Sequence, residues 1–213
     1  MSEIVKVENV TKYFKQEKVL DDVNMNLETG HIYGIVGKNG AGKTVLFKII
    51  AGFIKPSSGK VTVAGKIIGV DRDFPDSLGL IIETPGFLSQ YNAYQNLLYL
   101  ANINNKISKE DIKEAIRMVG LDPDSNKKVG KFSLGMRQRL GIAQAIMENP
   151  NLIILDEPMN GLDKKGIEDV KELLLKLKGD GKTILMASHY AEDMEICDEV
   201  FQMEDGKLGD MKK

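Results

Sequence analysis

The sequence predicts an α/β fold with a mostly parallel sheet, an N-terminal antiparallel β subdomain and an inserted α-helical subdomain. Three observations support this prediction. Apolar and polar residues alternate with the period of a strand in residues 4–27. From His31 onward, short apolar strand patterns alternate with longer helical patterns. Two further helical patterns interrupt that alternation, so we expect the inserted subdomain at about residues 83–132 of a single domain, 1–213.

The N-terminal subdomain is expected to consist of antiparallel strands. Alternate positions on its first two strands are apolar: Val5, Val7, Val23, Met25 and Leu27. These strands are expected to join near residues 15–18. Residues 60–68 predict a further edge hairpin with Gly65 at its turn, because glycine adopts a positive φ at little steric cost.

The core is expected to form from apolar strands that are separated by helices. The expected strands are residues 31–37, 78–82, 152–155 and 183–187, and the expected core helices are residues 45–50 and 164–178. Gly52 and Pro56 end the first of these helices. Strands alternating with helices at this spacing indicate a parallel sheet that helices cover.

The inserted subdomain is expected to contain two amphipathic helices, residues 93–103 and 109–119, each with one apolar stripe. After them, Ser133 is expected to cap a long helix that ends at Met147, because its hydroxyl can accept a hydrogen bond from a free helix N–H. The last residues, 209–213, are expected to fray.

The amino-acid composition limits the partners and the cellular environment that we expect for this protein. Lysine and arginine number 29 and the acids 31, a net charge of −2, so we expect no nucleic-acid partner, which would favour a basic excess. A single cysteine, Cys197, excludes an internal disulfide, is typical of a reducing cytoplasm and is expected to pack as a small hydrophobe. No segment approaches the roughly 20 apolar residues that span a bilayer, so we expect any membrane role to act through a partner.

A glycine-rich loop carries the clearest chemical signal. The segment GKNGAGKT fits the phosphate-loop (Walker A) pattern G-x-x-x-x-G-K-[ST] and joins an apolar strand to a helix. Its members are Gly37, Lys38, Asn39, Gly40, Ala41, Gly42, Lys43 and Thr44. Backbone N–H groups of such a loop cradle phosphates at a helix N-terminus, the lysine contacts the β- and γ-phosphates, and the hydroxyl reaches Mg²⁺. The alternative is a chance glycine-rich turn before a helix.

Two adjacent carboxylates follow the apolar run LIIL. We expect Asp156 to hold Mg²⁺ and Glu157 to orient or deprotonate an attacking water. The alternative is a helix N-cap, which also favours acids, but the following residues 158–161 predict a turn. Together the loop and the carboxylates predict a phosphate-loop NTPase core that hydrolyses a nucleoside triphosphate. His189 directly follows the strand 183–187, at the sheet edge where ligands of open α/β sheets bind, although an isolated histidine is more often a surface or core residue.

With these segments, FSLGMRQR at Phe132–Arg139 makes the chain resemble the nucleotide-binding subunit of an ATP-binding cassette (ABC) transporter over nearly its whole length. The resemblance implies an ATPase with ATP and Mg²⁺, acting as a head-to-tail homodimer that drives a separate transmembrane permease from the cytoplasmic face of the membrane. Ser133 and Gly135 then bind the γ-phosphate held by the other subunit, and His189 senses that phosphate. Asp163 lies in the loop Asn160–Asp163, which links the two sites. Phe14, with Tyr13 as second choice, stacks on adenine, unless Phe14 is a buried strand residue.

The chain departs from the family pattern at two places. Leu134 and Met136 replace a glycine and a glutamine of the signature, and Glu83 replaces a glutamine that reaches Mg²⁺ and the attacking water. The loop after it, residues 84–91, is the expected contact with the membrane subunit. With these residues, the chain resembles the branch of the family concerned with lantibiotic immunity and bacitracin-type peptide resistance. This resemblance implies export of a peptide antibiotic or another drug. Glu83 is otherwise a solvated loop acid.

Two other classes of function stay open at this point. A non-transport cassette ATPase that acts on nucleic acid or the ribosome usually carries two cassettes or a long coiled coil, and neither is present here. A nucleotide kinase or GTPase is the other alternative, but the sequence lacks the NKxD motif of GTPases.

Overall fold

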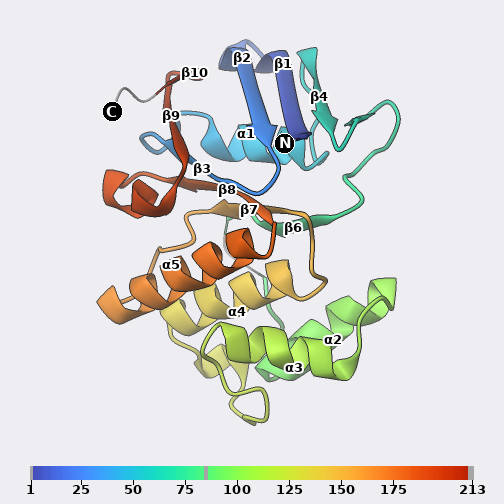
Figure 1. The fold of residues 1–213 in the computed structure, drawn as a ribbon, viewed down its shortest axis with the longest axis vertical. Coiled ribbons are helices and arrows are strands. Elements are labelled where there is room, and N and C mark those ends of the chain that lie inside the picture. The colour runs from blue at the N-terminus through green and yellow to red at the C-terminus, as the bar shows by residue number, and fades with distance from the viewer. Residues whose placement is uncertain (1, 84–85, 211–213) are drawn as a thin grey trace.

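Two β-sheets lie on opposite sides of helix α1 (Lys43–Ile50) in the computed structural model, which describes residues 2–83 and 86–210 (Figure 1). The antiparallel sheet has the order β2-β1-β4-β5 and the larger sheet the order β10-β9-β3-β8-β7-β6. The strands are β1 (Glu3–Phe14), β2 (Glu17–Glu28), β3 (Ile32–Val36), β4 (Ser58–Val63), β5 (Lys66–Ile67), β6 (Leu78–Ile81), β7 (Leu152–Asp156), β8 (Thr183–Ser188), β9 (Glu199–Glu204) and β10 (Lys207–Asp210).

The antiparallel sheet confirms the N-terminal prediction. Strands β1 and β2 pair from Glu3 with Glu28 to Phe14 with Glu17, and the five predicted apolar positions are buried in the core cluster that also contains residues of α1. The edge hairpin of β4 and β5 turns at Gly65, whose φ is +75°. A glycine suits that left-handed conformation, because other residues pay a steric penalty there.

The larger sheet is parallel from β6 to β9, and only β10 runs antiparallel. Every residue of β7 and β8 is buried, because helices cover both faces of a parallel sheet. Alternate residues of β7 reach different cores. Leu152 and Ile154 pack with α1, whereas Ile153 and Leu155 pack with the helices on the other face. Asp156 therefore ends the strand on the side of α1.

Four longer helices complete the fold: α2 (Ala93–Asn104), α3 (Lys109–Met118), α4 (Leu134–Ile146) and α5 (Lys164–Gly179). Figure 1 shows α4 and α5 beneath the larger sheet and α2 and α3 at the far end of the molecule from the antiparallel sheet. All four match the predicted helices within two residues, and Ser133 caps α4 as predicted. The boundaries of an inserted subdomain stay a prediction.

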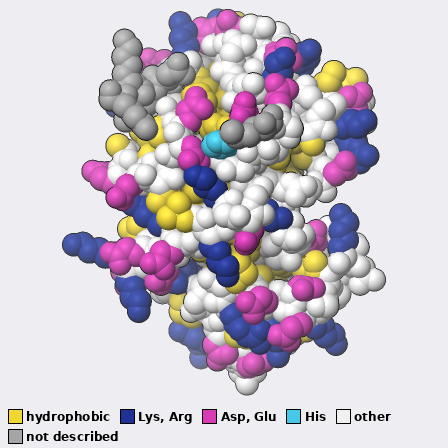
Figure 2. Space-filling model, viewed as in Figure 1, with side chains coloured by type: hydrophobic (Ala, Val, Ile, Leu, Met, Phe, Trp, Pro, Cys, Tyr) yellow, Lys and Arg dark blue, Asp and Glu magenta, His cyan; other side chains and the backbone are white. Residues whose placement is uncertain are grey.

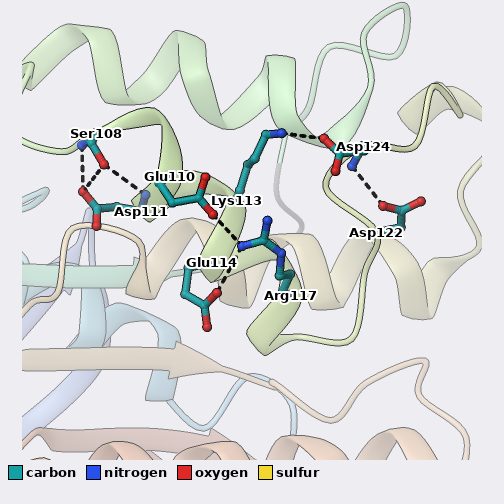
Figure 3. Close-up of polar contacts among 8 residues, drawn as sticks. All are labelled: Ser108, Glu110, Asp111, Lys113, Glu114, Arg117, Asp122 and Asp124. Atoms are coloured by element: carbon teal, nitrogen blue, oxygen red, sulfur yellow. Dashed lines mark hydrogen bonds and ion pairs between the residues drawn. The ribbon is translucent and has the colours of Figure 1, made fainter.

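Polar contacts lie along α3 (Figure 3). Ser108 and Asp111 form a capping box, in which each side chain bonds the backbone N–H of the other. From the middle of the helix, Lys113 Nζ lies 2.5 Å from Asp124 Oδ1 in the loop that follows the helix. Three buried side chains pack α3 against its neighbours: Ile112, Ala115 and Ile116.

Three local predictions were wrong or incomplete. Helix α1 begins at Lys43, two residues earlier than predicted, because Gly42 takes a left-handed φ of +112° and lets the helix start inside the loop. Strands β9 and β10 were not predicted. Gly209 and Asp210 belong to β10 rather than to a frayed end, since they pair with Gln202 and Phe201; residues 211–213 lie outside the described part.

Two expectations from composition can be compared with the structure. Burial raises the pKa of the Cys197 thiol to about 12, which agrees with its prediction as a packed hydrophobe rather than a nucleophile. Among the described residues, no helix is long and apolar enough to cross a membrane.

On the face shown in Figure 2, basic and acidic side chains are interspersed.

Candidate active site

The backbone of the glycine-rich loop forms a cradle at the N-terminus of α1. Gly40 and Gly42 both have positive φ, +83° and +112°, which turn the chain from β3 into the helix. Gly42 is the N-cap and offers no side-chain hydrogen bond. The first N–H groups of the helix therefore lack a side-chain acceptor and, with the positive end of the helix dipole, favour an anion such as phosphate.

Neighbouring strands hold this loop tightly. A Cβ at Gly37 would lie 2.3 Å from the carbonyl oxygen of Met203, and one at Gly42 would lie 2.8 Å from Leu20 Cδ2. The N–H of Gly206, in the β9–β10 turn, donates to the carbonyl of Ala41 at 3.1 Å. Sequence reasoning missed this support, although Asp205-Gly206 is a common hairpin-turn signal.

Lys43 lies folded over the loop. Its side chain is buried, and its Nζ donates to the carbonyls of Gly37 at 2.6 Å and Lys38 at 3.2 Å. The same Nζ lies 3.7 Å from Glu157 Oε1. A buried ammonium with several oxygen partners is positioned to bind phosphate oxygens as a point charge.

Thr44 and Asp156 meet at the mouth of the cradle. The Thr44 hydroxyl donates to Asp156 Oδ2 at 2.6 Å. Burial is the largest cause that raises the pKa of Asp156. The hydrogen bond from Thr44 lowers this pKa, and the nearby Glu157 carboxylate raises it. The described residues contain no group of three or more His, Cys, Asp or Glu that could hold a metal alone. One carboxylate and one hydroxyl beside a phosphate cradle nevertheless fit Mg²⁺, which prefers oxygen ligands and usually shares them with phosphates.

Glu157 lies at the turn after β7, with φ at +52°. Its carboxylate Oε2 is 2.8 Å from His189 Nδ1, and its N–H donates to Ala187 of β8 at 2.9 Å. Gln138 of α4 donates through Nε2 to the carbonyl oxygen of Glu157 at 3.1 Å. The N-cap alternative for this acid pair is wrong, because the next helix, α5, is capped by Asp163.

Two hollows lie beside the loop. One, of about 250 Å³, is lined by Val19, the loop residues 39–45, Asp156 and Glu157. The other, of about 450 Å³, lies between the loop, His189 and residues 202–205. A larger cavity of about 720 Å³ lies elsewhere, between α3, α4 and α5, and holds none of the loop residues. We place the chemistry at the smaller hollows, since they carry the phosphate cradle and the carboxylates.

The signature residues lie apart from this cradle. Ser133 is exposed, and its hydroxyl accepts a hydrogen bond from the N–H of Met136 at 3.2 Å. A Cβ at Gly135 would lie 3.0 Å from the carbonyl oxygen of Gly161, so α4 packs closely on the loop Asn160–Asp163. The described residues that line the two hollows include neither Ser133 nor Gly135. Leu134 is the first residue of α4, a helical position that does not require glycine.

Three more predicted residues have clear positions. Phe14 is 45% exposed at the end of β1, so its interpretation as a buried strand residue is wrong; Tyr13 beside it is also exposed. Asp163 caps α5 by accepting a hydrogen bond from Gly166 N–H at 2.9 Å. Glu83 follows β6, and its Oε1 lies 2.6 Å from Lys48 Nζ. Glu83 is thus exposed but paired, and residues 84 and 85 of the next loop lie outside the described part.

Comparison with known proteins identifies the family of the chain. Residues 20–160 match the family described as ABC transporter. The chain belongs to the ABC transporter family. Over 211 residues it is 42% identical to the bacitracin transport ATP-binding protein BcrA of Bacillus licheniformis, covering 98% of this chain and 69% of BcrA. Over 206 residues it is 35% identical to the lantibiotic transport ATP-binding protein SrtF of Streptococcus pyogenes, covering 96% of this chain and 89% of SrtF.

A solved structure supports the same family assignment. The dimeric post-hydrolysis structure of the ATP-binding cassette MJ0796, bound to ADP and Pi, has a TM-score of 0.88 and 26% identity to the chain, and covers 99% of this chain and all of that one. The predicted fold class is therefore confirmed. This chain is an ATP-binding and ATP-hydrolysing subunit of a transporter, and the kinase and GTPase alternatives are wrong.

The loop geometry makes a testable distinction between two glycines. A Cβ at Gly42 would meet Leu20 and the carbonyl of Val19, whereas one at Gly40 meets nothing within 4 Å. Both substitutions force alanine into a positive φ, which costs on the order of 1 kcal/mol. We expect Gly42→Ala to lower the melting temperature further than Gly40→Ala and to weaken ATP binding more, as measured by thermal unfolding and calorimetry. Equal effects of the two variants would contradict the close packing around Gly42.

Proposed function

We propose that this ATPase subunit powers the export of a peptide antibiotic through a separate transmembrane permease, to which it binds at the cytoplasmic face of the membrane. The names of BcrA and SrtF support this substrate class, since each is described as a transport ATP-binding protein, for bacitracin or for a lantibiotic. Glu83, where the family pattern has glutamine, supports the same branch. These relatives also favour transport over a role on nucleic acid or the ribosome.

The site suggests a role for each polar group. Backbone N–H groups of residues 37–42 and the Lys43 ammonium bind the phosphates, and Thr44, Asp156 and Glu83 lie on the Mg²⁺ side. These three side chains would hold Mg²⁺, which would supply positive charge that neutralises part of the phosphate charge. Glu157 orients an attacking water or accepts its proton, and His189, 2.8 Å from the Glu157 carboxylate, holds that carboxylate and contacts the γ-phosphate. Phe14 or Tyr13 stacks on the adenine ring.

The observation that carries the proposed homodimer is the separation of the signature from the cradle in one chain. Ser133 is exposed and does not line the hollows beside the phosphate loop. In a head-to-tail homodimer, Ser133 and Gly135 of one copy complete the γ-phosphate site of the other, and Asp163 lies in the loop between the two sites. The dimeric form of MJ0796 supports this arrangement. The complete active site then requires two chains.

A mixing experiment tests the shared site. Ser133→Arg and Lys43→Ala chains are each expected to be inactive, because each dimer lacks one half of both sites. An equal mixture should recover about a quarter of the wild-type ATPase rate, since half of the dimers are mixed and each of these has one intact site of two. ATPase activity measured across mixing ratios checks this. No recovery in preparations with demonstrated heterodimers would contradict a site shared between chains.

The substrate class has its own test. Cells that express the chain together with its transmembrane permease are expected to tolerate higher concentrations of bacitracin or a lantibiotic than cells without them. Lys43→Ala should abolish that gain, because the loop then lacks its phosphate-binding ammonium. Minimal inhibitory concentrations against a panel of peptide antibiotics measure both. A resistance gain that persists with Lys43→Ala, or no gain with any peptide, would contradict peptide export powered by this subunit.

A further inference from the structure

An ion pair joins helix α1 to the end of β6 on the acidic side of the site. Lys48 lies four residues after Thr44, so the two side chains leave α1 on the same face, one helical turn apart. The Lys48 Nζ is 2.6 Å from Glu83 Oε1. Of the hydrogen bonds and ion pairs among the described residues, this is the one that involves the Glu83 carboxylate.

Glu83 shares its surroundings with the two other carboxylates of the site. A hollow of about 150 Å³ is lined by Glu83, Asp156 and Glu157, together with residues of α4 and Asn160. Three carboxylates therefore line one hollow on the side of the site where the phosphates of ATP are expected, and unbalanced negative charge there opposes nucleotide binding.

We propose that Lys48 is a positioning residue that neutralises Glu83, so that a third carboxylate can lie beside the phosphate site without repelling ATP. This rests on the proposed placement of Glu83 on the Mg²⁺ side of the site. Lys48 holds the carboxylate at the end of β6, and the pair carries no net charge. Nucleotide affinity, rather than the stability of the fold, is the property that depends on the pair.

A second ion pair provides a matched control. Lys48 and Glu83 have 32% and 65% exposed side chains, and Lys113 and Asp124 have 30% and 67%. The control pair lies on the helical end of the molecule (Figure 3), far in the fold from the phosphate loop. Exposed pairs of this kind contribute little to folding, so neither lysine substitution is expected to lower the melting temperature by more than about 4 °C.

The test is a double-mutant cycle on metal-free ATP binding, measured by calorimetry in EDTA. Lys48→Gln should weaken ATP binding about fivefold to tenfold, because Glu83 is then unbalanced; tenfold corresponds to about 1.4 kcal/mol. Glu83→Gln should bind as well as wild type or more tightly. The double variant Lys48→Gln/Glu83→Gln should recover wild-type affinity within about twofold, because it removes both charges of the pair. Lys113→Gln should leave the affinity unchanged.

Two results would overturn the proposal. One is wild-type affinity in Lys48→Gln. The other is a double variant as weak as Lys48→Gln, which would mean that Lys48 attracts the phosphates itself rather than acting through Glu83. Lys43→Ala separates these outcomes from a failure of the site. If Lys43→Ala binds ATP weakly and Lys48→Gln binds normally, only the role of Lys48 is wrong. If Lys43→Ala binds normally, the placement of the site is wrong and the proposal falls with it.

Discussion

The structure depends on the backbone between β3 and α1, which must turn through left-handed conformations to present free N–H groups at the start of a helix. Gly40 and Gly42 supply that turn. The packing of Met203 against Gly37 and of Leu20 against Gly42 then fixes it from two hairpins that are far apart in sequence. A cradle that is already formed does not have to be ordered when an anion binds, so less conformational entropy is lost. The position of every other group in the site is defined relative to this cradle.

Charge is the second constraint on the site. The alternation along β7 sends Asp156 toward α1 and Thr44, while Glu157 turns toward β8 and His189. Burial of the Asp156 carboxylate is unfavourable, as its raised pKa shows. Lys43 lies between the loop carbonyls and Glu157 and supplies the nearest positive charge. The carboxylates place negative charge in the site before ATP binds, so nearby positive charge is needed to balance them. At the outer edge of the site, Lys48 beside Glu83 provides that positive charge.

The sequence predicted the parts of the site whose residues are close together along the chain. A strand, a glycine-rich loop and a helix follow one another along the chain, and Asp156-Glu157 follows its strand directly, so motif and periodicity were sufficient. The prediction failed where the structure depends on contacts between distant residues. The packing of Met203 on the loop, the bond from Gln138 to Glu157 and the pair of Lys48 with Glu83 join residues that no short pattern connects. The exposure of Phe14 agrees with the favoured interpretation, an aromatic that stacks on adenine, and not with a buried strand residue.

We propose that two copies of this chain enclose ATP between them and separate after hydrolysis. Glu157→Gln tests it most directly, because an amide of the same length keeps the shape of the site but cannot accept a proton from water. Light scattering with saturating ATP and Mg²⁺ measures the outcome. We expect ATP affinity near that of wild type, loss of turnover, and a stable dimer that forms with ATP and not with ADP. A variant that stays monomeric with ATP, or that hydrolyses ATP at the wild-type rate, would contradict it.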